Sequence, residues 1–233
     1  MSATLLFPAP AWPTLPTGDG TRVPVGRIFC VGRNYEAHAA EMGTQVDRET
    51  PFWFTKSPHA VVEGGATVPY PPGTQDYHHE IELVAVLGGG GFRVPAGTAN
   101  DLILGYAAGL DMTRRDLQLA ARAKGRPWDV GKDVEQSAVV GPVALAARIG
   151  HPTRGRIALH VNGQVRQQAD IAELAWKVPE LVAHLSTLYH LRPGDVIMTG
   201  TPAGVGPVRP GDRLEGEVEG VGTVALTIGP PEA

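Results

Sequence analysis

The sequence has little cysteine, with one residue, Cys30, among 233. A single thiol cannot form an intramolecular disulfide, so the fold depends on a hydrophobic core rather than on cross-links. Cys30 lies in the apolar run 28–31, which favours a small buried side chain over a reactive thiol. The chain also lacks an HExxH motif, which together with the shortage of cysteine argues against a zinc site.

The chain also has no large excess of charge of one sign and no long hydrophobic run. Lys plus Arg number 20 and Asp plus Glu number 24, so the net charge is 20 − 24 = −4. This balance, with a pI near 6.1, argues against a general nucleic-acid binder. No apolar run approaches the roughly 18 residues of a membrane span. The N-terminus has no basic region and too many prolines for a signal peptide. We therefore expect a cytoplasmic protein.

Glycine and proline are abundant, with 30 and 21 residues, and hydrophobic residues make up 42% of the chain. This composition supports a real core and predicts short strands joined by many tight turns. Residues 1–24 are rich in Pro and Gly and have no periodicity, so we expect an N-terminal lead-in segment there. We expect residues 25–233 to form one main domain.

The hydrophobic pattern predicts more strands than helices. Strands are expected at 26–31, 52–55, 80–87 and 102–110 and in the last 40 residues, where Arg-Pro-Gly-Asp turns occur twice. Asn162-Gly163 predicts a type I′ hairpin within 157–168. Helices are expected between an Asn34 cap and Gly43, at 113–123, and at 178–188. In the last of these, one face is expected to hold Val178, Leu181, Val182, Leu185 and Leu188. Residues 124–138 are expected to be irregular.

Carboxylates provide the first candidate site. Glu80 and Glu82 are two residues apart on a predicted strand, so they point to the same face, while Ile81, Leu83, Ala85 and Leu87 can fill the other. Asp111 ends the next apolar strand. Each has a simpler explanation, a solvated strand edge for the glutamates and a helix N-terminus for Asp111. If the three meet, they form an oxygen site for Mg²⁺, Mn²⁺ or Ca²⁺. The adjacent His78 and His79 are expected to pack or hydrogen-bond instead.

Other polar residues could act beside such a site. His38 and Glu41 are three residues apart on a predicted helix, where a carboxylate can orient an imidazole as a general base, although a surface pair fits equally well. Arg115 and Gln118 follow Asp111 on one helix face. Lys132 is expected in a solvated loop. The loop containing Thr201, at 199–204, could hold an anionic group through its backbone amides, but it lacks the lysine of a P-loop.

Taken in order, several segments resemble the fumarylacetoacetate hydrolase family, from about residue 26 to 229. The matching segments are 32–41 (GRNYEAHAAE), 79–82 (HEIE), 109–118 (GLDMTRRDLQ), 124–128 (KGRPW) and 199–206 (TGTPAGVG). No single segment is specific, but the combination is. Within the family, the lead-in LFPAPAWPTLP and the segments 29–35 and 161–167 are most similar to the bacterial branch that splits fumarylpyruvate in gentisate breakdown.

The resemblance implies an α+β fold that is mostly β, a mixed roll or barrel with a few flanking helices, usually a homodimer. It implies that Glu80, Glu82 and Asp111 bind Mg²⁺ or Mn²⁺, with Ca²⁺ a possible substitute. His38 and Glu41 match a water-activating pair on a lid segment. Residues expected to hold the oxygens of a small 2,4-dioxo acid are Arg115, Gln118, Lys132 and Thr201, with Lys132 stabilising the oxyanion.

The implied activity is metal-dependent hydrolysis of the C–C bond of an acylpyruvate, with no nucleic-acid or membrane partner. Alternatives within the family are oxaloacetate decarboxylation and isomerisation of a hydroxy-diene-dioate, and an alternative outside catalysis is a metal-dependent binding protein. One departure supports the last alternative. Asp133 stands where relatives have Gly, and its carboxylate could restrict the loop or pair with Lys132.

Overall fold

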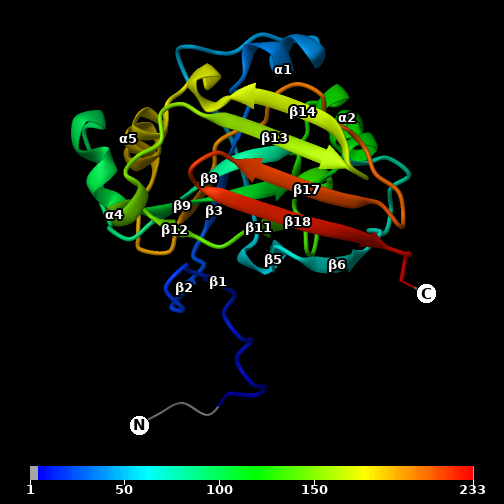
Figure 1. The fold of residues 1–233 in the computed structure, drawn as a ribbon, viewed down its shortest axis with the longest axis horizontal. Coiled ribbons are helices and arrows are strands. Elements are labelled where there is room, and N and C mark those ends of the chain that lie inside the picture. Colours follow the sequence, from blue (N-terminus) through cyan, green and yellow to red (C-terminus); the bar gives the residue numbers. More distant parts are fainter. Residues whose placement is uncertain (1–4, 233) are drawn as a thin grey trace.

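Two curled sheets form the body of this computed structural model, which describes residues 5–232 (Figure 1). The larger sheet has the order β4-β3-β15-β8-β9-β11-β5, with β12 paired to β9. The sheet is mixed, because β15 is parallel to β3 and β11 is parallel to β5, while β15 is antiparallel to β8. The strands of this sheet are β3 (Ile28–Gly32), β4 (Phe52–Lys56), β5 (Val61–Glu63), β8 (Ile81–Leu87), β9 (Ile103–Asp111), β11 (Ala138–Val140), β12 (Ala144–Leu145) and β15 (Val196–Met198).

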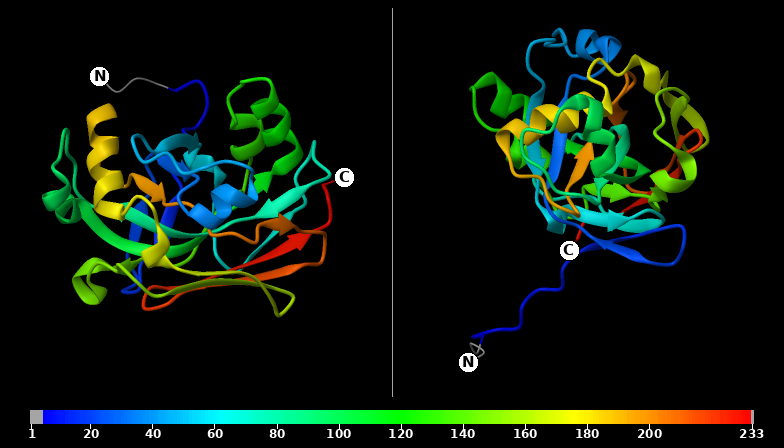
Figure 2. Two further views of the ribbon diagram at one scale, coloured as in Figure 1. Left: turned by 90° about the horizontal axis from the view of Figure 1, so that it is seen from above. Right: turned by 90° about the vertical axis from the view of Figure 1, so that its left-hand side faces the viewer.

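The second sheet has the order β14-β13-β17-β18-β6 and lies against the first (Figure 2). Its strands are β6 (Ala66–Pro69), β13 (Arg156–Val161), β14 (Gln164–Asp170), β17 (Arg213–Val218) and β18 (Gly222–Gly229). Smaller pairings join β7 (Tyr77–His79) to β10 (Thr113–Arg114) and β16 (Gly206–Pro207), and β1 (Thr14–Pro16) to β2 (Arg22–Pro24). The predicted mostly-β, mixed roll is confirmed.

Helices lie around the rim of the sheets (Figure 2). The α-helices are α1 (Glu36–Glu41), α2 (Arg115–Ala123), α3 (Asp129–Lys132), α4 (Ala146–Ile149) and α5 (Val178–Leu188), and the 3₁₀ turns are η1 (Pro58–Ala60), η2 (Ala96–Leu102) and η3 (Ile171–Glu173). Among the described residues, no helix is long and apolar enough to cross a bilayer.

Strand β8 lies at the centre of the core and is buried along its whole length. Ile81, Leu83 and Ala85 belong to the apolar cluster shared with the second sheet. The sheets approach closely there, because a Cβ at Gly216 of β17 would lie 2.5 Å from Ile81 Cδ1. The alternate residues of β8, beginning with Glu82, occupy the other face. The fold therefore fixes this strand on both sides, which makes it a rigid support for polar groups.

The predicted turns are confirmed. Asn162 and Gly163 have φ of 52° and 77°, as a type I′ hairpin requires. In both Arg-Pro-Gly-Asp turns the glycine has positive φ, 87° at Gly194 and 95° at Gly211. In each turn the Asp N–H donates to the Arg carbonyl three residues earlier. These are type II turns, with Pro at the second position and Gly at the third.

Some expected details were wrong. Asn34 does not cap α1; its amide bridges Thr199 and Trp176, and Tyr35 occupies the cap position. Helix α2 begins at Arg115 because the two residues before it pair with β7. Residues 124–138 contain α3. On α5, four of the five predicted apolar residues are buried, but Leu188 is 55% exposed at the helix end.

The N-terminal segment contains a hairpin that belongs to the packed structure. Leu15 of β1 is buried in the second apolar cluster, beside Val25 and Ile28. Residues 5–12 extend from this hairpin as an arm (Figure 1). Met1–Thr4 of the predicted lead-in and Ala233 of the predicted main domain lie outside the described residues. The division at residue 24 stays a prediction.

Candidate active site

Three buried carboxylates meet where β8 and β9 pair. The antiparallel register places Ile81 opposite Leu110 and Glu82 opposite Gly109, and the Asp111 N–H donates to the Glu80 carbonyl at 2.9 Å. Glu80 and Glu82 share one face of the strand, and Asp111 is brought beside them from β9. One carboxylate oxygen of each lies within 4.8 Å of the others, and none of the three residues is more than 4% exposed. The predicted cluster is present, and a solvated strand edge is ruled out.

Three buried cations surround these carboxylates. Lys132 Nζ lies 2.8 Å from Glu80 Oε2 and 2.7 Å from Asp111 Oδ2. Arg115 pairs with Glu80 Oε1, and Lys56 Nζ lies 2.9 Å from Asp111 Oδ1. The local sequence predicted a solvated loop for Lys132, and the family resemblance placed it in the site. One turn of helix, α3, carries it into the site with 2% of its surface exposed.

Burial and neighbouring charges set the pKa values in the cluster. Burial alone would raise the pKa of Glu80, but Lys132 and Arg115 outweigh it and hold that pKa well below its usual range. Burial raises the pKa of Glu82 far above its usual range, and Asp111 and Glu80 raise it further. For Lys132, the carboxylates of Asp111 and Glu80 outweigh burial and raise the pKa. Glu82 is therefore the carboxylate whose charge is least compensated.

The donor set fits a divalent metal ion. Three carboxylates and no thiolate form the oxygen-rich surroundings that Mg²⁺ and Mn²⁺ prefer. Among the described residues, Asp111 Oδ1 accepts no hydrogen bond, although it is fully buried. Lys56 lies near it as an ion-pair partner, but its hydrogen bonds go to Ser137 Oγ and to the Met112 and Lys132 carbonyls. Asp111 Oδ1 is thus held by an ion pair but accepts no hydrogen bond within the described structure, which leaves it able to bind a metal ion.

The expected pair on α1 is formed and faces the same pocket. His38 Nδ1 lies 3.1 Å from Glu41 Oε2, and His38 is 7% exposed. The Glu41 carboxylate also accepts the backbone N–H of Gly204, at 3.1 Å. Gly204 has φ of 96°, and a Cβ there would lie 2.1 Å from the Arg166 carbonyl oxygen, so only glycine fits. With Nδ1–H directed to Glu41, the second ring nitrogen of His38 is available as a proton acceptor.

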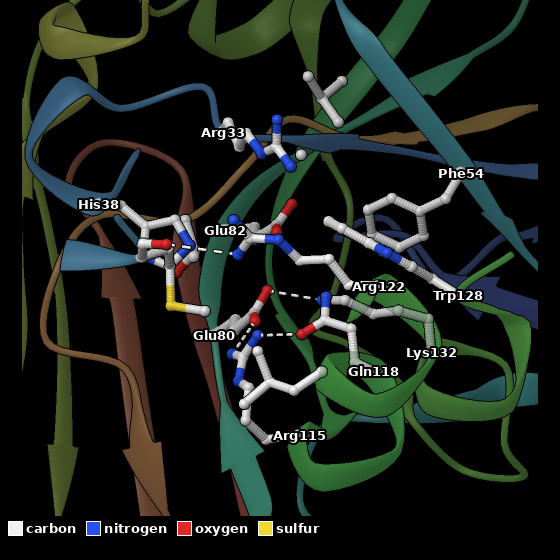
Figure 3. Close-up of a pocket in the computed structure, with 15 residues that line it drawn as sticks. Arg33, His38, Phe54, Glu80, Glu82, Arg115, Gln118, Arg122, Trp128 and Lys132 are labelled. Carbon is white, nitrogen blue, oxygen red and sulfur yellow. Dashed lines mark hydrogen bonds and ion pairs between the residues drawn. The ribbon is translucent and has the colours of Figure 1, made fainter. Parts of the chain in front are cut away.

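The residues expected to hold a substrate lie on the pocket wall. Arg115 Nη1 donates to Gln118 Oε1, and Figure 3 shows these two side chains beside Glu80 and Lys132. Thr201 Oγ1 accepts the Gln167 amide at 2.8 Å and also lines the pocket. The structure thus brings all nine predicted site residues into one cluster or onto its rim.

The pocket opens away from the carboxylates toward aromatic and basic side chains. Arg33, Phe54, Arg122 and Trp128 line both the inner pocket and an outer groove that continues from it. In Figure 3 Arg33 lies on the far side of the carboxylates from Arg115. The pocket therefore has an acidic, cation-lined floor and an aromatic, basic mouth.

Sequence reasoning missed two buried positioning residues. Gln167 accepts the Ile81 N–H at 3.0 Å, contacts His79 Nδ1 at 3.0 Å and donates to Thr201, so it ties the hairpin to the site. Lys56 contacts Asp111 as described above. An amide in a strand or a lysine after an apolar strand gives no sequence signal, because only the tertiary fold supplies their partners. The expectation that His78 and His79 pack or form hydrogen bonds is confirmed, since His79 contacts Gln167 and His78 contacts Asp76.

The effect expected of Asp133 was wrong in one respect. Its carboxylate accepts the backbone N–H of Ser57 at 2.8 Å and fixes the start of η1. Lys132 pairs with Glu80 and Asp111 instead. The departure from the family pattern therefore leaves the lysine in the site.

Comparisons with known proteins agree with this geometry. A family model described as fumarylacetoacetate (FAA) hydrolase, C-terminal, matches residues 27–229. A fumarylpyruvate hydrolase from Ralstonia sp is 55% identical over 193 residues, which cover 82% of this chain and 100% of that protein. A mitochondrial oxaloacetate tautomerase from Arabidopsis thaliana is 40% identical, with coverages of 87% and 90%.

A solved structure is also similar throughout. The crystal structure of fumarylpyruvate hydrolase from Pseudomonas aeruginosa in complex with Mn²⁺ and pyruvate superposes with a TM-score of 0.94 at 46% identity. The match covers 97% of this chain and 100% of that one.

Proposed function

The chain belongs to the fumarylacetoacetate hydrolase family, and we propose that it is a metal-dependent hydrolase that splits fumarylpyruvate into fumarate and pyruvate. One observation carries the proposal: a buried three-carboxylate cluster and a His–Glu pair face each other across one pocket. The cluster suits the pyruvoyl end of a 2,4-dioxo acid bound through a divalent ion, and the pair suits activation of water.

Glu80, Glu82 and Asp111 would hold the Mg²⁺ or Mn²⁺ ion. When bound, the ion supplies a Lewis acid for the oxygens of the pyruvoyl end. The protein's own charges favour an anionic substrate there. Three carboxylates face three cations, Lys56, Arg115 and Lys132, so a divalent ion leaves the site with surplus positive charge. A dioxo acid offsets this surplus.

Proton transfer falls to His38. Its free ring nitrogen accepts a proton from a water molecule, while Glu41 holds the ring and stabilises the imidazolium that forms. The water oxygen adds to the 4-oxo carbon of the substrate. The C3–C4 bond then breaks, and its electron pair stays with the pyruvoyl fragment, which takes up a proton to give pyruvate. The acyl fragment leaves as a carboxylic acid, here fumarate.

Lys132, Arg115, Gln118 and Thr201 orient the substrate and stabilise negative charge on its oxygens. Each is nearly buried, and each is held by at least one partner in the site. Donors fixed before the reaction need little reorganisation when charge develops in the transition state. The same pocket without water activation could serve an oxaloacetate tautomerase, so the two activities have to be compared directly.

A substrate panel tests the proposal. Fumarylpyruvate, acetylpyruvate and oxaloacetate are each supplied with Mg²⁺, with Mn²⁺ or with chelator, and the products are quantified. We expect metal-dependent release of fumarate and pyruvate in equal amounts, and a much lower kcat/KM for any conversion of oxaloacetate. Efficient turnover of oxaloacetate with intact fumarylpyruvate would contradict the proposal and support the tautomerase.

We further propose that the chain forms a homodimer. The arm at 5–12 supports this, because Leu6, Phe7 and Trp12 are 100%, 73% and 57% exposed, and apolar side chains of this size are usually covered. Light scattering should give twice the 24.6 kDa chain mass, and deleting residues 1–12 should shift the protein toward monomer. Its role in aromatic catabolism and its cytoplasmic location stay predictions.

A further inference from the structure

Two arginines at the pocket mouth have no acidic partner among the described residues. Lys132 and Arg115 are paired with carboxylates of the cluster, and His38 is paired with Glu41. Within residues 5–232, neither Arg33 nor Arg122 forms an ion pair, although both line the pocket. Two guanidinium groups that line one pocket without an acidic partner form a site that an anion would stabilise.

In the described part of the chain, Arg33 is held in place without the use of its side-chain N–H donors. Its guanidinium carbon lies 5.3 Å from the ring centre of Phe52 and 6.0 Å from that of Trp128, so both contacts are to aromatic faces. The residue has φ of 60°, a conformation that is uncommon outside glycine. Burial and the charge of Arg122 lower the pKa of Arg33. The backbone thus pays a conformational cost to place this guanidinium at the mouth.

Arg122 approaches the same space from α2. Its Nη1 donates weakly to the Met42 carbonyl, at 3.3 Å, at the end of α1. In Figure 3 Arg33 lies above Glu82, Arg122 lies between the levels of Glu82 and Glu80, and Phe54 and Trp128 lie to one side. Within residues 5–232 the Met42 carbonyl is the only hydrogen-bond partner of the Arg122 guanidinium, and the rings of Phe54 and Trp128 form an aromatic wall of the same pocket.

We propose that Arg33 and Arg122 form a subsite that binds the distal carboxylate of a dicarboxylic acylpyruvate. This inference rests on the proposed function, which places the pyruvoyl end at the carboxylate cluster and so directs the acyl chain toward the mouth. The subsite favours acyl groups that end in a carboxylate over neutral ones of the same length. A planar unsaturated chain such as fumaryl can pack against the aromatic wall formed by Phe54 and Trp128, whose ring centres lie 5.8 Å apart.

A matched pair of substrates tests the subsite. Fumarylpyruvate and crotonylpyruvate share the unsaturated chain and differ in the last group, a carboxylate in one and a methyl in the other. For the wild type, the ratio of kcat/KM for fumarylpyruvate to kcat/KM for crotonylpyruvate should be greater than one. In Arg33→Leu and Arg122→Leu that ratio should fall about 10- to 100-fold, the range for charge-assisted hydrogen bonds. Arg122→Lys should retain part of the preference.

The control is Arg126→Leu, because Arg126 is exposed at the outer edge of the groove and does not line the inner pocket. In this variant, the ratio of kcat/KM for fumarylpyruvate to kcat/KM for crotonylpyruvate should equal that of the wild type. Product inhibition provides a readout that needs no variant: fumarate should inhibit the wild type more strongly than crotonate, which lacks only the distal carboxylate. Equal inhibition by the two acids would overturn the subsite.

The outcomes separate this inference from the proposed function. If the enzyme hydrolyses both acylpyruvates and neither leucine variant changes the ratio of their kcat/KM values, the subsite is refuted and the proposed function stands. A wild-type enzyme that splits neither substrate would refute the function, and the subsite with it.

Discussion

At the scale of single residues, the site is defined by buried charges that compensate one another. Glu80, Asp111 and Lys132 form a compact network in which each ion has a partner within 2.8 Å. Glu82 is different, because its only side-chain hydrogen bond within the described structure comes from the Gly200 N–H, at 2.8 Å. Removing one member of a buried network leaves the others uncompensated, so its cost depends on which charge is lost.

Glu82→Gln tests the metal site with the smallest structural change. The variant keeps the shape of the side chain and removes a charge that burial already disfavours, so it should fold at least as stably as the wild type without metal. Its affinity for Mn²⁺, measured by calorimetry, should fall at least about tenfold. Unchanged affinity in Glu82→Gln, and also in Asp111→Asn, would mean that the ion binds elsewhere.

His38→Ala tests the proposed base. Water activation acts in the transition state, so kcat should fall about 10²- to 10⁴-fold while KM changes little. The variant should bind Mn²⁺ as the wild type does, because His38 is not one of the three clustered ligands. A change confined to KM would make His38 a binding residue and would remove it from the mechanism.

At this scale the sequence indicates the three carboxylates of the metal site more clearly than the buried residues around them. The i, i+2 spacing of Glu80 and Glu82 and the position of Asp111 at a strand end made a cluster possible, and the family resemblance implied it. The partners of Lys132 were not predictable, because a one-turn helix in a Gly-containing stretch has almost no periodicity. Gln167 was equally hidden, since its hydrogen bonds reach residues 86 and 34 positions away.

At the scale of elements, α1 and the segment after it cover the site through polar contacts. Residues 41–50 include no buried residue. They are held by the Trp176 indole, which donates to the Asp47 carbonyl at 2.8 Å, by Arg48, which donates to the Ala175 carbonyl, and by the Glu41–Gly204 bond. A segment with little apolar burial opens at low cost. This supports the predicted lid.

Hydrogen exchange measures the lid directly. Amides of residues 36–50 should exchange fast in the free protein and more slowly with Mg²⁺ plus oxalate, which resembles the chelating end of the substrate. Amides of β8 serve as the internal reference, because that strand is buried throughout. Equal, strong protection of 36–50 in both states would show a fixed wall rather than a lid.

Gly204→Ala tests the contact between the lid and the loop at 199–204. The added Cβ would meet the Arg166 carbonyl at 2.1 Å in a backbone conformation that favours glycine. We expect a loss of roughly 1–3 kcal/mol in unfolding free energy and a lower kcat. Gly211→Ala is the matched control, with φ of 95° but no atom near the new Cβ. Equal effects on activity in both variants would rule out the contact as the cause.

Most elements were predictable because their signals are local. Asn162-Gly163, the two Pro-Gly turns and the apolar face of α5 need no distant partner. The cap expected of Asn34 failed because tertiary hydrogen bonds to Thr199 and Trp176 replaced the local one. Likewise Thr113 pairs with His78 of β7 and does not begin the following helix. Such errors occur where distant pairing competes with local preference.

At the scale of the whole molecule, the two sheets make a stable support for a buried, charge-rich site. Strand β8 links the apolar core to the carboxylates, so metal binding and global folding act on the same element. A ligand that binds only the folded state raises its stability.

Thermal unfolding with and without Mn²⁺ tests this linkage. At 100 times its dissociation constant the ion should add about 2.7 kcal/mol, which corresponds to a rise in Tm of roughly 5–10 °C for a chain of this size. Asp111→Asn should show a rise close to zero. A Tm that Mn²⁺ leaves unchanged in the wild type would mean that the ion does not bind to the native cluster.

The central claim is that the carboxylate cluster supports hydrolysis of fumarylpyruvate. The most direct measurement is quantification of fumarate and pyruvate formed from fumarylpyruvate by the wild type and by Asp111→Asn, each with Mn²⁺ and with chelator. We predict equal amounts of the two products from the wild type with Mn²⁺, and almost none in the other three reactions. Equal product formation by the wild type with chelator, or by Asp111→Asn, would contradict the account.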